Sequence, residues 1–348
     1  MKNKWRTISA FLGIVICAVL IWGLNETPKS SYYHNDGKVF GTYYNIRYEA
    51  VTDLHDSIRT ALQAFDNSLS MFNPHSVISA INANRDTTTD AAFEAMWAEA
   101  ERIYRLSDGA FDITVAPLVN YWGFGNKDRF AEREKTASPK EKRQKLTIDS
   151  LLAFVGFEKV RLEEHKVVKS DMRVKIDAGA VAKGQACDMI AAVLRRNGCH
   201  HYLVDIGGEV VCHGLNSKGE PWHVGITKPN INNEGVQNDL QEVLVLSDAC
   251  MATSGNYRNY YYADGERRSH TIDPRTGWPV QHSLLSATVI STTCMRADAL
   301  ATACMVTGAD KALELIQQSG DAACYLIVAQ NDSLVSIVSP NWHKMTSK

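Results

Sequence analysis

Two oxygen-bearing side chains stand four residues apart near the C-terminal end of the chain. Asp298 and Thr302 belong to a segment, residues 296–306, that is predicted to be helical, so both side chains fall on one helix face. A carboxylate and a hydroxyl are hard oxygen ligands, which suit Mg²⁺ better than zinc. Backbone carbonyls, phosphate oxygens and water would have to complete the octahedral site. The spacing alone also fits an ordinary polar helix face.

A second chemical signal lies where a predicted strand, ending at Ile176, gives way to a predicted helix over residues 181–197. Asp177 follows the strand, and small residues (178–180) form the turn before the helix. Small residues at a helix start let a ligand approach the backbone, and the free N–H groups there attract phosphate or carboxylate. Ala180 could offer a carbonyl oxygen to a cation.

Lys183 lies in the first turn of that helix, where the helix dipole disfavours a positive charge. This placement indicates a bound anion. The alternative is that Lys183 is solvated and that the small residues only permit close packing. The segment contains neither G-x-G-x-x-G nor G-x-x-x-x-G-K-[ST], so the dinucleotide-binding and P-loop signatures do not apply.

His270 sits in a loop, residues 269–277, that is dense in Ser, Thr, Asp, Pro and Gly. A histidine can accept a proton near neutral pH, which makes His270 a candidate general base. The alternative is a turn histidine with a structural hydrogen bond. A stretch of aromatic residues and glycines, residues 121–125, could stack on a planar ligand or form a packed corner of the core.

The N-terminal residues predict a membrane anchor. Lysines and an arginine within residues 1–6 precede an apolar run over residues 8–24 that contains no charge. We expect residues 1–25 to be an uncleaved anchor or signal segment, residues 26–38 a tether, and residues 39–340 one catalytic domain outside the cytoplasm. Cys17 could mark lipoprotein processing, but Ile16 precedes it where a small residue is expected.

The rest of the composition narrows the function classes. The 348 residues are 45% hydrophobic, enough for a sizeable core, and the net charge of −2 argues against a broad nucleic-acid-binding surface. The chain has 8 cysteines, one of them inside the expected anchor, and the odd number that remains argues against a complete disulfide framework. The seven are scattered without C-x-x-C, which argues against a zinc site.

Predicted helices and strands intermingle without strict βαβ alternation, so the fold class is α+β, or mixed α/β. Helices are expected over residues 53–69, 90–107, 181–197, 296–306 and 309–318. Strands are expected over residues 39–48, 202–206, 222–227, 243–246, 284–292, 325–329 and 334–338.

Taken together, the motifs resemble those of the FAD:protein FMN transferases, the ApbE-type flavin transferases. The resemblance runs from about Val39 to the last strands. Its most specific parts are residues 109–112 (GAFD), 177–188, 207–208 (GG), 253–257 (TSGNY), 269–277 (SHTIDPRTG) and 297–302 (ADALAT). Each motif is weak alone, and six in this order are a specific signal.

The resemblance implies a two-lobed fold with FAD in a cleft between the lobes. It implies Mg²⁺-dependent transfer of FMN from FAD to a threonine hydroxyl of an acceptor redox protein, with release of AMP. The localisation implied is the bacterial inner membrane, with the catalytic domain on the periplasmic side. Two alternatives remain: an Mg²⁺-dependent FAD pyrophosphatase that releases FMN and AMP, and a non-catalytic flavin-binding or assembly protein.

The resemblance also assigns roles to single residues. Ala180, Asp298 and Thr302 match metal ligands, and His270 matches a proposed proton acceptor for the threonine. The positions that match FAD contacts are Phe40, Phe72, Ala110, Phe111, Asp112, Asp177, Lys183, Thr253 and Ile272. The chain departs from the family pattern with Phe40 for Met, Phe72 for Tyr, and Ala301 where some relatives carry Asp.

Overall fold

A computed structural model describes most of the chain after the apolar N-terminal run. The described residues are 29–125, 141–229, 239–256, 260–263, 266–331 and 333–346. Within these ranges no helix is both long and apolar enough to span a bilayer. The expected anchor, residues 1–25, lies outside them.

The described residues form one large sheet of eight strands, in the order β1-β2-β5-β6-β9-β12-β13-β14, and every neighbouring pair is antiparallel. The strands are β1 (Ser31–Val39), β2 (Thr42–Ala50), β5 (Tyr202–Ile206), β6 (Glu209–His213), β9 (Asp248–Gly255), β12 (Leu284–Ser291), β13 (Ala323–Gln330) and β14 (Ser333–Val338). A large antiparallel sheet with helices confirms the mixed α/β, or α+β, class.

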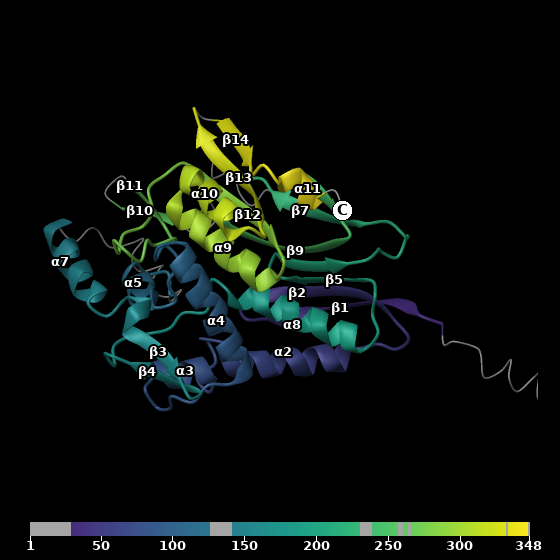
Figure 1. Cartoon of the computed structure of the whole chain (residues 1–348), viewed down its shortest axis with the longest axis horizontal. Coiled ribbons are helices and arrows are strands. Elements are labelled where there is room, and N and C mark those ends of the chain that lie inside the picture. Colours follow the sequence, from purple (N-terminus) through teal and green to yellow (C-terminus); the bar gives the residue numbers. More distant parts are fainter. Residues whose placement is uncertain are drawn as a thin grey trace, which may run out of the picture.

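The main core lies between this sheet and a group of helices (Figure 1). These helices are α2 (His55–Leu69), α3 (Val77–Asn82), α4 (Ala91–Leu106), α8 (Ala182–Arg196), α9 (Cys294–Thr307) and α10 (Ala309–Ser319). Apolar side chains at helical spacing, such as Ile58, Leu62 and Phe65 of α2, are buried there. Asp90 accepts a hydrogen bond from the Phe93 N–H and so caps α4.

A second, smaller core covers part of the sheet with the ribbon of β7 (Trp222–Thr227) and β8 (Leu240–Leu246) and with α11 (Trp342–Thr346). The alternation along β7 buries Trp222, Val224 and Ile226 and leaves the residues between them on the other side of the ribbon.

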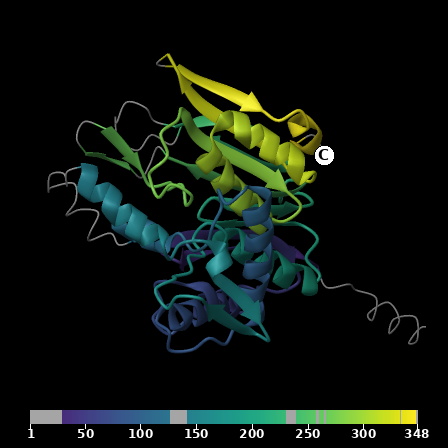
Figure 2. The same cartoon turned by 60° about the vertical axis from the view of Figure 1, so that its left-hand side comes forward.

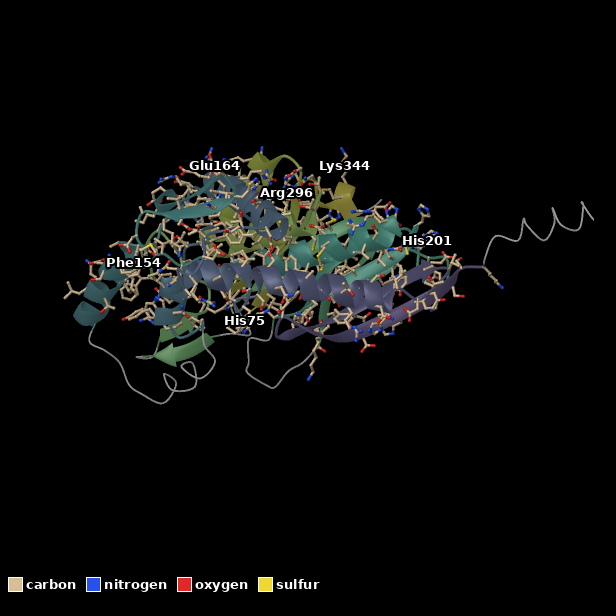
Figure 3. All side chains as sticks on the ribbon, turned by 90° about the horizontal axis from the view of Figure 1, so that it is seen from below. His75, Phe154, Glu164, His201, Arg296 and Lys344 are labelled. Atoms are coloured by element: carbon tan, nitrogen blue, oxygen red, sulfur yellow. The ribbon has the colours of Figure 1, made fainter. Side chains whose placement is uncertain are left out.

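A third core joins α5 (Ala116–Tyr121) and α7 (Glu141–Leu152) to the loop that contains Ile272. In Figures 1 and 2, α7 extends from the same side of the molecule as the hairpin of β10 (Tyr260–Ala263) and β11 (Glu266–Ser269). Figure 3 places Phe154, just after α7, at one end of the long axis and His201, beside β5, toward the other. The remaining elements are η1 (Phe157–Lys159), β3 (Val160–Glu163) and β4 (Lys166–Lys169).

The structure corrects the expectation for the segment before the first strand. The tether expected over residues 26–38 is, from Ser31, the strand β1, and the strand expected over residues 39–48 is divided by a turn at Phe40 and Gly41. The physical reason is position: β1 is the edge strand of the sheet, so it exposes most of its side chains and its sequence is polar. Gly41 takes a φ of 75° in that turn.

None of the described cysteines is in a disulfide, and six of the seven are buried thiols. They behave as small apolar side chains in the core.

The crossing of α8 and α9 depends on one glycine. A Cβ atom at Gly184 would lie 2.3 Å from the Cys294 carbonyl oxygen and 2.8 Å from the Met295 nitrogen, both of them backbone atoms that cannot swing aside. The first turn of α8 therefore packs directly on the first turn of α9.

We expect Gly184→Ala to lower the free energy of unfolding by about 1–3 kcal/mol, because the added methyl group forces the two helices apart. Chemical denaturation of the purified full chain would measure this change. Arg196→Ala, an exposed change near the other end of α8, is the matched control and should have little effect. Equal stability of the two variants would contradict the proposed crossing.

Candidate active site

One cavity of about 1010 Å³ gathers most of the residues that the sequence singles out. It lies where β5 ends, β6 begins and β9 ends, next to α9 and the loop after β11. The predicted residues that line it are Ala110, Phe111, Asp112, Asp177, Ala180, Lys183, Thr253, His270, Ile272, Asp298 and Thr302. Segments that are up to about two hundred residues apart in the chain thus converge on one space.

The turn before α8 forms one wall of the cavity. The Asp177 carboxylate accepts a hydrogen bond of 2.7 Å from the Gly179 N–H, and the Asp177 N–H donates to the Ile113 carbonyl oxygen. Burial raises the pKa of Asp177, and the Gly179 donor only partly offsets this. The same turn carries Ala180, which also lines the cavity.

Lys183 is held between two buried carboxylates. Its Nζ atom lies 2.6 Å from Glu209 Oε1 and 3.8 Å from Asp298 Oδ1. Burial opposes the charge of Lys183, but the attraction of Asp298 and Glu209 outweighs it and raises the pKa of the lysine. The charge at the helix start is therefore compensated within the chain, and it does not by itself require a bound anion.

Asp298 and Thr302 both face the cavity from α9. The Gly184 N–H donates to Asp298 Oδ2 over 3.0 Å, and Thr302 Oγ1 lies 3.2 Å from the Ser254 hydroxyl. Among the described residues there is no cluster of three or more His, Cys, Asp or Glu side chains that could hold a metal ion. A hard cation here would have to use a mixed set of oxygen donors.

The residues present fit a magnesium ion in that way. A carboxylate, a hydroxyl and a turn with backbone carbonyls border the same cavity, and Mg²⁺ characteristically takes one or two carboxylates and fills its remaining positions with water and phosphate oxygens. Asp298, Thr302 and the carbonyl of Ala180, in the turn at residues 178–180, are the groups that would hold it.

His270 and Ile272 reach the cavity from the loop that follows β11. The His270 ring packs edge-on against Phe124, with 6.2 Å between the ring centroids, and Phe124 also lines the cavity. Ile272 is buried and pairs with Pro279 through an isolated β-bridge, which closes the loop. Thr253 lines the cavity from the end of β9, and its hydroxyl lies 2.9 Å from that of Thr288.

The Asp112 carboxylate is already occupied by the protein. Its Oδ1 atom accepts hydrogen bonds from the N–H and the hydroxyl of Thr114, both at 2.7 Å, and its Oδ2 atom accepts from the Phe157 N–H. Burial raises the pKa of Asp112, although these donors oppose the shift. Asp112 therefore fixes the shape of this wall of the cavity.

Phe40 and Phe72 are not among the described residues that line the cavity. Phe40 has a φ of 51° in the turn between β1 and β2 and packs on Phe65, with 5.4 Å between the rings. Phe72 is 75% exposed. Gly179 lines the cavity, and the Cε atom of Met71, the neighbour of Phe72, lies 3.8 Å from where a Cβ atom at Gly179 would stand. The loop that carries Phe72 therefore borders the cavity wall.

Several lining residues have no role in the predictions from sequence. Glu209 is the main one: it is 2% exposed, begins β6 and binds Lys183 directly. Asp205, Tyr43 and Ser254 also line the cavity, and the Asp205 carboxylate accepts from the Gly208 N–H. The available signal for Glu209 was an acidic residue directly after a Gly-Gly turn, at the start of an otherwise apolar strand.

Comparisons with known proteins show the family to which the chain belongs. Residues 40–326 match the model of the ApbE family. The chain is 34% identical to the FAD:protein FMN transferase of Haemophilus influenzae, over 98% of each chain, and 32% identical to that of Escherichia coli K12, over 95% of each.

Solved structures match over a similar extent. The flavin transferase ApbE from Vibrio cholerae has a TM-score of 0.77 and 31% identity, covering 91% of this chain and 99% of that one. The apo form of the Pseudomonas stutzeri flavinyl transferase ApbE has a TM-score of 0.78 and 29% identity, covering 92% and 98%.

We expect Asp112→Asn to lower the free energy of unfolding by about 1–3 kcal/mol, because an amide cannot accept from all three of the donors that the carboxylate satisfies. Denaturant unfolding would measure the loss, and quenching of flavin fluorescence would measure FAD affinity in folded protein. A variant with native stability but strongly reduced FAD affinity would show that the carboxylate contacts the ligand.

Proposed function

Because the chain belongs to the ApbE family, we propose that it is an FAD:protein FMN transferase. The reaction moves the FMN part of FAD onto the hydroxyl of a threonine in an acceptor protein. A bond forms between the threonine oxygen and the FMN phosphorus, the bond from that phosphorus to the bridging oxygen of the diphosphate breaks, and AMP leaves with that oxygen.

The observation that carries this proposal is the meeting of three segments in one cavity. Lys183 and the turn at Ala180 come from the start of α8, Asp298 and Thr302 from α9, and His270 from the loop after β11. Cleaving a diphosphate requires charge stabilisation at its oxygens and a positioned nucleophile, and these segments supply groups for both.

Each group has a task that its position allows. Lys183 can place its positive charge beside the diphosphate, and the small residues of the turn before α8 let the diphosphate approach the backbone closely. Asp298, Thr302 and the Ala180 carbonyl would hold Mg²⁺. When bound, this ion would neutralise charge on the diphosphate oxygens. His270 can take the proton of the incoming threonine hydroxyl.

The size of the cavity supports a dinucleotide substrate. Its volume of about 1010 Å³ is at the upper end of the range of about 300–1,000 Å³ that is typical of small-molecule sites. The aromatic ring of Phe124 beside His270 offers a surface on which a planar ring can stack.

The proposal includes a location and a partner class. The basic and then apolar N-terminal residues favour an inner-membrane anchor with the catalytic domain on the periplasmic side. The acceptor would be a redox protein of the same compartment, such as a subunit of a membrane electron-transfer complex. The net charge of −2 gives no reason to expect nucleic acid as a partner.

The decisive test incubates the full chain, purified in detergent, with FAD, Mg²⁺ and a candidate acceptor domain. We expect flavin fluorescence on the acceptor band after denaturing electrophoresis. We expect Asp298→Ala to lower the transfer rate at least about 100-fold, because it removes the only carboxylate among the proposed metal ligands. Asp310→Ala, an exposed change at the start of α10, should leave the rate unchanged.

Other outcomes of this assay would replace the proposal. Free FMN and AMP without labelling of any acceptor would indicate an FAD pyrophosphatase. Binding of FAD with neither product would indicate a flavin-binding protein. Full activity of Asp298→Ala would remove Asp298 from the site.

We expect His270→Ala to slow transfer by about 100- to 10,000-fold while FAD affinity changes little, because a general base acts on the threonine and not on bound FAD. Single-turnover transfer gives the rate, and flavin fluorescence quenching gives the affinity. His34→Ala, an exposed histidine on β1, serves as the control. Parallel losses of rate and affinity would make His270 a binding residue instead.

A further inference from the structure

The ammonium group of Lys183 has two carboxylates within reach, and it is much closer to one of them. Nζ lies 2.6 Å from Glu209 and 3.8 Å from Asp298. Both carboxylates are 2% exposed, so water does little to weaken either attraction. The position of the lysine is therefore set by competition between the two.

This competition affects the proposed metal site, because the Asp298 carboxylate cannot bind an ammonium group and a divalent cation equally well at the same time. An ammonium group in contact with Asp298 would cancel its charge and repel a cation at the same oxygens. Burial raises the pKa of Glu209, and the Lys183 ammonium opposes that shift. With Glu209 ionised against the lysine, Lys183, Glu209 and Asp298 together carry one net negative charge. With Glu209 neutralised, their net charge would be zero.

The backbone holds Glu209 in the place from which it can bind the lysine. Glu209 is the first residue of β6 and pairs with Ile206 across a turn in which Gly207 and Gly208 take φ values of 67° and 103°. The Cys187 thiol, on α8, donates to the Glu209 carbonyl oxygen over 3.1 Å. The strand that carries Glu209 is thus tied to the helix that carries Lys183.

The Glu209 carboxylate is not fully satisfied by the protein. Its second oxygen, Oε2, is buried and has no hydrogen-bond partner among the described residues. A buried carboxylate with one unpaired oxygen costs folding free energy, and replacing a buried ion pair by apolar residues is often neutral or stabilising. Stability alone is therefore a poor reason for an acid at this position.

We infer that Glu209 is a positioning residue that draws the Lys183 ammonium away from Asp298 and so leaves the Asp298 carboxylate able to bind a divalent cation. This inference rests on the proposed Mg²⁺ site. Glu209 would act through the lysine and need not touch the cation or the substrate itself.

The test measures metal affinity without turnover. Mn²⁺ is titrated into the full chain in detergent, without FAD, while electron paramagnetic resonance reports the free ion and Mg²⁺ is added as a competitor. We expect Glu209→Gln to weaken binding of both ions about tenfold, since the amide keeps the shape of the side chain but no longer attracts the ammonium strongly. Glu242→Gln, an exposed change on β8, is the matched control.

A second substitution separates positioning from a general loss of structure. In Glu209→Gln combined with Lys183→Met no ammonium remains to occupy Asp298, so we expect metal affinity to return to within about threefold of wild type. Thermal unfolding of each variant checks that the fold is retained.

Three results would overturn the inference, and they are distinguishable. Unchanged metal affinity in Glu209→Gln would show that Glu209 does not control access to Asp298. A double variant as weak as Glu209→Gln alone would make Glu209 a metal ligand or a structural residue. If the wild-type chain binds neither Mn²⁺ nor Mg²⁺, the proposed metal site itself is wrong, and the inference fails with it.

Discussion

The crossing of α8 and α9 at Gly184 is the constraint on which the site depends. The missing side chain at Gly184 lets its N–H reach Asp298 Oδ2, and the same helix turn carries Lys183. Further along α8, the Asp188 carboxylate accepts from the Cys294 and Met295 N–H groups, both at 2.9 Å. α8 therefore holds the start of α9 in place and also presents Lys183. A shift of either helix would move both Lys183 and Asp298.

α9 is a rigid carrier for Asp298 and Thr302, the two side chains proposed as metal ligands. It is buried on nearly all sides, and most of its residues are small, so its backbone packs closely on the sheet and on neighbouring helices. At its first turn Arg296 forms ion pairs with Glu99 of α4 and with Asp321 before β13. The groups that would hold the cation thus stand on a fixed frame, whereas His270 stands on a loop.

The sequence predicts the helices and the site segments well, because both depend on local patterns. The apolar spacing in α2 and α4 and the small residues before α8 are all readable within a few residues. The grouping of Asp177, Lys183, Asp298 and His270 came from resemblance to a family, and the structure brings these residues to one cavity. Features that depend on distant neighbours were not predicted: β1 has polar residues because it is an edge strand, and the Asp112 carboxylate turns toward the Phe157 backbone.

Lys183 shows most clearly why distant contacts matter. A lysine in a first helical turn looks unbalanced in the sequence and suggests a bound anion, but two carboxylates from other elements outweigh its charge. A group of one ammonium and two carboxylates does not attract a diphosphate by charge alone. It favours a divalent cation, and the cation and the diphosphate would then each lower the cost of binding the other. If the proposed metal ion binds here, it and the substrate would bind as one unit, and the balance among Lys183, Glu209 and Asp298 would set the affinity for both.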